Sequence, residues 1–90
     1  MTATIHIHLV HRQHTDGRKT VAVQGDTVGR ALADLIVRYP AMETELFDKK
    51  GNLRGHIEIY LNAKSAFPGE LEKPVNSGDD IQIVTFLAGG

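Results

Sequence analysis

The sequence predicts an α+β domain in which a mixed sheet of four to five strands has one main helix packed across it. Apolar and polar residues alternate along residues 3–10, 20–24 and 56–62, as is typical of half-buried strands. A segment with helical spacing follows the second strand, and a further apolar strand pattern, residues 80–86, comes near the end. The β-grasp arrangement has this order of elements: strand, strand, helix, strand, short segments and strand.

The first two strands are predicted to form a hairpin over residues 3–24. Ile5, Ile7 and Leu9 share one face of the first strand, where they alternate with His6, His8 and Val10. Asp16-Gly17 supplies the turn signal before the second strand.

The helix is predicted to begin with Asp26 or Thr27 as its N-cap and to end after Tyr39, because Pro40 follows. Its apolar residues share the face expected to meet the sheet: Val28, Leu32, Leu35 and Ile36. Its charged residues take the opposite face: Arg30, Asp34 and Arg38.

The middle of the chain is less regular. Residues 42–47 fit one further helical turn, and residues 63–74 fit a loop with a short edge strand or a turn near Leu71. The crossover between the first and last strands is long enough for these two strands to lie side by side in parallel.

Composition favours one domain over residues 1–86. The chain has 90 residues, 41% of them hydrophobic, and its 10 basic and 11 acidic residues argue against nucleic-acid or membrane partners. It has no cysteine, which excludes a disulfide framework, a Cys-type zinc site and a thiol nucleophile. Since its start lacks the pattern of a signal peptide, we expect a cytoplasmic protein.

The most informative feature is the end, Leu87-Ala88-Gly89-Gly90, which we expect to form a flexible tail over residues 87–90. Glycine has no Cβ, so Gly89 and Gly90 can pass through a slot too narrow for other residues and present the carboxylate to a partner's active site. The alternative is a tail whose glycines have no role. If Ile81 and Ile83 face the core, Val84 and Phe86 form an exposed apolar patch beside the tail. Together with Leu87, Ala88 and Gly89 they are the predicted partner-binding residues.

Three other patterns have simpler interpretations. His6 and His8, with His11 and His14 nearby, could suggest a metal site, but no ligand set of fixed spacing completes it, so we expect solvent-facing polar positions and no metal. The segment 25–29 lacks the GK[ST] of a phosphate loop and fits a helix start. Asp79 and Asp80 fit a turn, where Asp bonds the backbone.

The β-grasp order, the Gly78-Asp79 turn before an apolar strand and the Ala88-Gly89-Gly90 end together form a recognisable pattern. In this pattern the chain resembles the ubiquitin-like sulfur carriers, which include the small subunit of molybdopterin synthase and the thiamine sulfur carrier. The resemblance is greatest to the sulfur carrier of thiocarboxylate-dependent cysteine biosynthesis. Where many relatives have prolines shortly before the tail, this chain has Thr85-Phe86-Leu87. The shared pattern comprises Arg12, His14-Thr15, Gly17, Lys19, Val21, Gly25-Asp26-Thr27, Gly29, Asp34-Leu35, Tyr39, Leu46, Asp48, Gly51, Leu53, Ile59-Tyr60, Asn62, Gly69, Leu71, Gly78-Asp79 and Ala88-Gly89-Gly90.

The resemblance implies a protein co-substrate rather than an enzyme, with no bound cofactor. An E1-like activating enzyme, using ATP and magnesium, would adenylate Gly90, and sulfur would then displace AMP to leave a thiocarboxylate. The acceptor would be a biosynthetic enzyme, in the cysteine pathway a PLP-dependent cysteine synthase, with a peptidase releasing the product. Three alternatives stay open: a modifier conjugated to lysines through Gly90, a sulfur donor for molybdopterin, thiamine or another metabolite, and an interaction module with an inert tail.

Overall fold

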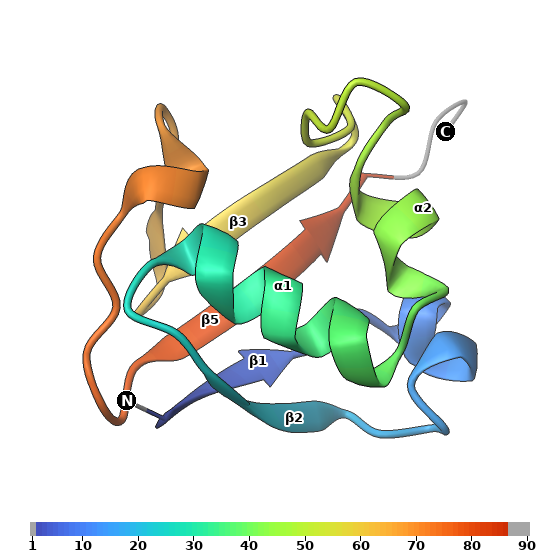
Figure 1. Ribbon diagram of the computed structural model, residues 1–90, viewed down its shortest axis with the longest axis horizontal. Coiled ribbons are helices and arrows are strands. Elements are labelled where there is room, and N and C mark those ends of the chain that lie inside the picture. The colour runs from blue at the N-terminus through green and yellow to red at the C-terminus, as the bar shows by residue number, and fades with distance from the viewer. Residues whose placement is uncertain (1, 87–90) are drawn as a thin grey trace.

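The structure is a computed structural model that describes residues 2–86. In this part of the chain five strands form one mixed sheet in the order β2-β1-β5-β3-β4, and helix α1 lies across one face of it (Figure 1). The strands are β1 (Thr2–His6), β2 (Thr20–Gln24), β3 (Ile57–Leu61), β4 (Lys64–Ser65) and β5 (Asp80–Thr85). The helices are α1 (Val28–Arg38), α2 (Met42–Leu46) and two 3-10 helices, η1 (Leu9–His14) and η2 (Glu70–Glu72).

The first and last strands pair in parallel, as predicted. Ile5 of β1 is opposite Ile81 of β5 on one side and opposite Val21 of the antiparallel β2 on the other. Strand β5 also pairs antiparallel with β3, where Ile83 is opposite Ile59. The sheet therefore combines two hairpins, β1–β2 and β3–β4, with the parallel pair that the long crossover allows.

The core lies between the sheet and α1. The predicted inner face of the helix is confirmed, since Val28, Leu32 and Leu35 are fully buried, and Ile36 packs at the margin of the core. Fully burying one such aliphatic side chain contributes about 1.5–3 kcal/mol. The sheet supplies the facing layer, which includes Ile5, Val21, Val23, Ile57, Ile59, Ile81 and Ile83.

Local contacts fix where α1 begins. Thr27 is the N-cap, and its hydroxyl accepts a hydrogen bond from the Arg30 N–H at 3.2 Å. Gly25 precedes it where a Cβ would lie 2.6 Å from the backbone nitrogen of Ala31, so only glycine fits there. The segment 25–29 is thus a helix start. The helix ends at Arg38, with Tyr39 as the C-cap before Pro40.

The predicted first strand is wrong beyond His6. Ladder pairing between β1 and β2 ends with the Ile7 N–H donating to the Lys19 carbonyl at 2.8 Å. His8 then accepts from the Val10 N–H at 3.2 Å and so caps η1. Leu9, expected on the inner face, is 70% exposed because the chain has left the sheet.

The loop predicted over residues 63–74 contains β4 and η2, and Leu71 of η2 packs against the core. Across residues 2–86, no helix has the length and apolar character needed to cross a membrane.

Candidate functional site

Strand β5 leads to the predicted reactive end and presents two different faces. Ile81, Ile83 and Thr85 are buried, which confirms the predicted inner face. Between them Gln82 is exposed and Val84 is half-buried, and Phe86 follows with 55% exposure. The loops therefore do not cover Phe86. Partner binding by Val84 and Phe86 stays a prediction.

The last backbone hydrogen bond described lies at Phe86. Its N–H donates to the carbonyl of His56 at 2.8 Å, one residue beyond the Ile57–Thr85 pair of β3 and β5. The predicted site residues Leu87, Ala88, Gly89 and Gly90, and with them the predicted tail, lie outside the described residues. Their roles stay predictions as well.

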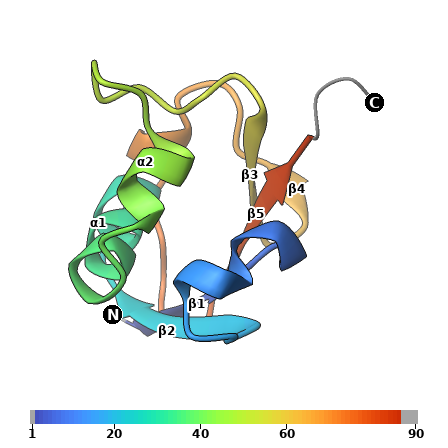
Figure 2. The same ribbon diagram turned by 90° about the vertical axis from the view of Figure 1, so that its right-hand side faces the viewer.

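A groove of about 410 Å³ lies beside Phe86 and was not predicted from the sequence. Leu53, Ile57 and Phe67 contribute apolar surface to it, and Phe67 is 71% exposed. Arg54, Glu58 and Glu70 add charge of both signs. We call this the tail-side groove. In Figure 2, β3, β4 and β5 are on one side of the molecule and α1 and α2 on the other.

Phe67 could not be found from the sequence, because it belongs to a loop without periodicity. The only signal was a large aromatic residue beside Pro68 in a predicted loop. Large exposed apolar side chains grouped on one surface mark interaction sites in soluble proteins.

The outer side of β3 carries a tyrosine next to an acid. The negative charge of Glu58, and then its hydrogen bond, raise the pKa of the Tyr60 phenol, which therefore stays neutral and a hydrogen-bond donor. On the other side of β5, where His6 of β1 is opposite Gln82 as Tyr60 is, His6 Nε2 lies 2.9 Å from Asp80 Oδ1. Its side chain is partly exposed, as predicted for a polar strand position.

His11 is the main departure from the predicted histidine arrangement. It was expected to face solvent, but only 3% of it is exposed. Nε2 of His11 lies 2.8 Å from Thr85 Oγ1, and Nδ1 lies 3.1 Å from Glu45 Oε1. Burial lowers the pKa of His11, and the hydrogen bond and charge of Glu45 oppose part of that shift.

The other acidic and histidine residues do not assemble into a metal site. Within residues 2–86, no group of three or more histidine, aspartate or glutamate side chains has the geometry to hold a metal ion. Asp79 bonds the turn, as predicted for it: its carboxylate accepts from the Asn76 N–H at 2.8 Å and from Asn62 Nδ2 at 3.0 Å. Both bonds lower the pKa of Asp79, and the bond from the Asn76 backbone has the larger effect.

A second cleft, of about 580 Å³, lies on the helical side of the molecule. Ala33 and Ile36 of α1 line it together with Phe47 and Arg54, which follow α2. Arg54 is held there by a hydrogen bond from its Nε to the carbonyl of Thr44 at 2.7 Å. The residues that line this cleft carry no arrangement that assigns it a chemistry.

Residues 9–90 match the family described as the ThiS family. The chain is 34% identical to the sulfur carrier protein CysO of Mycobacterium tuberculosis over 93 aligned residues, which cover 100% of both proteins. It is also 35% identical over 77 residues to small archaeal modifier protein 1 of Haloferax volcanii, covering 82% of this chain and 85% of that one.

Solved structures show the same fold. The chain superposes on a chain of the Amycolatopsis orientalis BexX/CysO complex with a TM-score of 0.88 and 32% identity, covering 98% of this chain and 99% of that one. For Mycobacterium tuberculosis CysO the TM-score is 0.86 at 32% identity, with coverage of 94% and 99%. These matches confirm the predicted β-grasp fold. Our chain belongs to the ThiS family of ubiquitin-like sulfur carriers.

Proposed function

We propose that this protein carries sulfur as a thiocarboxylate on Gly90 and donates it to a biosynthetic enzyme, in the first instance for cysteine synthesis. One observation carries the proposal: the similarity to CysO runs through the whole chain, including the Gly-Gly end. The protein acts as a co-substrate, and its partners supply the catalytic groups.

The chemistry needs only the terminal carboxylate from this chain. On an E1-like enzyme with ATP and magnesium, a carboxylate oxygen of Gly90 attacks the α-phosphorus of ATP and pyrophosphate leaves. Sulfide then attacks the carbonyl carbon of the mixed anhydride and AMP leaves. If a partner's persulfide attacks instead, the product is an acyl disulfide, and a second thiol of that partner cleaves it to the thiocarboxylate while the partner is left with a disulfide. The resulting thiocarboxylate sulfur is ionised at neutral pH and is a better nucleophile than the carboxylate.

The acceptor in this proposal is a PLP-dependent enzyme of the cysteine synthase type, whose cofactor supplies the electrophile that the sulfur attacks. A peptidase then releases the product from the carrier. Docking on the activating enzyme and on the acceptor enzyme would use Val84, Phe86 and the tail-side groove. The complex that Amycolatopsis CysO forms with BexX supports the view that members of this fold dock on other proteins.

A second function is favoured by a specific observation, the match to small archaeal modifier protein 1. In that case the same activated Gly90 would form an isopeptide bond with lysines of other proteins. Both functions begin with adenylation, so the product of the second step has to separate them.

Intact-mass spectrometry tests the proposal. The purified protein is incubated with ATP, magnesium, sulfide and an extract of its native host, beside a matched variant that lacks Gly90. We expect the full-length chain to gain the mass difference between sulfur and oxygen and to react with a thiocarboxylate-selective alkylating reagent. The shortened variant should gain no mass, although its melting temperature should equal that of the full-length chain.

Each other outcome has a definite meaning. High-mass conjugates linked through Gly90, without the sulfur-bearing species, would establish the modifier and contradict the carrier. An unchanged mass with no conjugates would contradict both and leave an interaction module with an inert tail. A large loss of thermal stability in the shortened variant would show that residue 90 belongs to the folded domain.

A further inference from the structure

The two halves of β5 are held in different ways. The parallel partner β1 pairs only with the first half, through Asp80, Ile81 and Gln82. The antiparallel partner β3 pairs along the strand to Thr85. The end of β5 that leads to the tail therefore lacks the support of β1, as the divergence of the two strands in Figure 1 shows.

A histidine side chain contacts this end of β5 instead. His11 comes from η1, the segment that β1 enters where it leaves the sheet, and its Nε2 lies 2.8 Å from Thr85 Oγ1. His11 is 3% exposed and Thr85 is 8% exposed, so the bond is shielded from water. Thr85 is the last residue of β5.

Glu45 of α2 sets the direction of this hydrogen bond. An ionised carboxylate only accepts hydrogen bonds, so Nδ1 of His11 carries the proton and donates to Glu45 Oε1 at 3.1 Å. Burial lowers the pKa of His11 and so favours the neutral ring, in which Nε2 is then the acceptor and the Thr85 hydroxyl donates to it. The protonation of the ring and the orientation of the hydroxyl are thus both defined.

Carboxylate, imidazole and hydroxyl follow one another here in the order found in serine hydrolases. Catalysis by the hydroxyl is excluded by its burial, because a nucleophile has to reach its substrate. Thr85 is instead the last residue of β5, directly before Phe86. The network can therefore act on the tail only by holding the strand that leads to it.

We propose that His11 is a positioning residue for the reaction at Gly90: through Thr85 it fixes the direction in which the chain leaves β5. The inference rests on the proposed carrier function. His11 holds the end of β5 through the Thr85 side chain, and the bond from the Phe86 N–H to His56 holds the backbone at 2.8 Å. These two anchors restrict the orientation of Phe86, from which the chain continues to Gly90, and restricted orientation raises the rate of a bound reaction.

Four variants separate the two ends of the imidazole. Thr85→Val removes the hydroxyl at similar size, and Thr85→Ser keeps it. His11→Gln places an amide near the position of Nε2, whereas His11→Asn places it near Nδ1 and leaves Thr85 without its partner. Thr20→Val is the matched control, because Thr20 is an exposed threonine of β2.

The first measurement is hydrogen exchange of the Phe86 amide in the full chain, followed by NMR and compared with core amides such as those of Ile59 and Ile81. We expect protection at Phe86 to fall about three- to tenfold in Thr85→Val and His11→Asn, as is usual for the loss of one buried hydrogen bond. Thr85→Ser, His11→Gln and Thr20→Val should stay close to the wild type. Unchanged exchange at Phe86, or an equal change at Phe86 and the core amides, would overturn the proposal.

The second measurement is steady-state adenylation of the same variants by the host's activating enzyme. We expect kcat to fall about three- to tenfold in Thr85→Val and His11→Asn, with KM nearly constant. In Thr85→Ser and His11→Gln, kcat should stay close to that of the wild type. An unchanged kcat in Thr85→Val, with an active wild type, would overturn the positioning role. A wild type that is not adenylated would instead refute the carrier function, and the Phe86 exchange alone would then decide whether His11 fixes the exit of the chain.

Discussion

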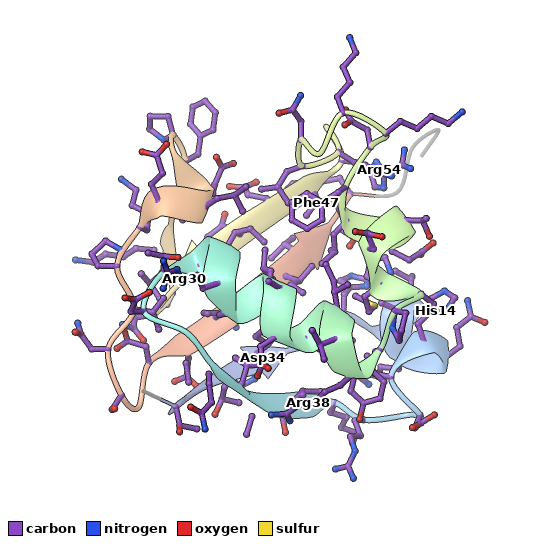
Figure 3. All side chains as sticks on the ribbon, viewed as in Figure 1. His14, Arg30, Asp34, Arg38, Phe47 and Arg54 are labelled. Atoms are coloured by element: carbon purple, nitrogen blue, oxygen red, sulfur yellow. The ribbon has the colours of Figure 1, made fainter. Side chains whose placement is uncertain are left out.

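The two edges of the sheet end differently. At the β2 edge, Asp34 of α1 accepts from the Gln24 N–H at 2.9 Å, and Nη1 of Arg38 donates to the Ala22 carbonyl at 2.7 Å. Asp34 and Arg38 also pair with each other at 3.3 Å. Figure 3 shows both side chains reaching from α1 toward β2. This edge is closed by charged side chains.

The opposite edge is covered by only a short strand. Strand β4 has two residues, and the Ala66 N–H adds one more bond, to the carbonyl of Ile59 at 2.9 Å. Beyond it lies the tail-side groove with Phe67 and Phe86. An open edge with apolar surface invites other chains, and charged side chains discourage them. We therefore expect other chains to associate on this side of the sheet rather than along β2.

The largest expected effect comes from loosening the helix that closes the β2 edge. Leu35 is fully buried on the inner face of α1. Leu35→Ala should lower the free energy of unfolding by about 2–5 kcal/mol, since it removes core contacts and leaves a cavity. Urea denaturation measures this change. Val37→Ala on the exposed side of the same helix is the control and should change stability by less than about 0.5 kcal/mol. Similar losses in both variants would show that the helix face is assigned wrongly.

The next largest effect concerns the open edge. Phe86→Asp should weaken binding to the activating enzyme at least about thirtyfold, or roughly 2 kcal/mol, because it places a charge on an apolar docking surface. The melting temperature should hardly change, because the side chain is exposed. Calorimetric titration gives the affinity. Leu9→Asp makes a matched change at an exposed position on η1, and equal weakening by both variants would argue against a specific docking role for Phe86.

A smaller effect is expected at the closed edge itself. Arg38→Ala removes the hydrogen bond to Ala22 and should cost about 1 kcal/mol, as well as raise the tendency to self-associate along β2. Arg30→Ala is the control on the same helix, because the Arg30 side chain is exposed and pairs with the exposed Asp26 at 3.6 Å. Denaturation and light scattering report the two quantities. If Arg38→Ala and Arg30→Ala had the same stability and were both monomeric, Arg38 would not protect this edge.

Periodicity predicted most of the fold. The alternation at Ile57 and Ile59 and the helical spacing of Leu32 and Leu35 each reflect burial against one face, which a local pattern records. The same rule failed at Leu9, because alternation continues in the sequence after the ladder with β2 has ended. There the chain begins a 3-10 helix instead of continuing the strand, because the His8 side chain accepts a capping hydrogen bond from the Val10 N–H.

The site was less predictable than the fold. The exposure of Phe86 was predicted correctly because this residue continues the alternation of β5. Phe67 and His11 were not, because their surroundings come from residues far away in the sequence: His11 meets Thr85 across 74 positions and Glu45 across 34. No local pattern encodes such a meeting, so a histidine in a polar segment is by default assigned to the surface.

The smallest expected effect is the pH dependence of the stability that His11 contributes. This dependence distinguishes a buried neutral histidine from an exposed one. Since burial lowers the pKa of His11 below its ordinary value of 6.5, the unfolded chain takes up a proton at a higher pH than the folded one. The stability that His11 contributes is therefore complete above about pH 6.5 and is lost as the pH falls through its lowered pKa. Glu45 of α2 opposes the lowering, His8 and His14 of η1 add to it, and the Thr85 hydroxyl of β5 is uncharged.

Melting temperatures of the wild type and His11→Gln between about pH 8 and pH 5 test this sign. The glutamine variant lacks the titrating group, so its stability should fall less on acidification and the gap between the two proteins should narrow. A gap that widens would mean that the folded state binds the proton more tightly than the unfolded one. His11 would then be held as a cation by Glu45, and Nε2 would donate to Thr85 rather than accept from it.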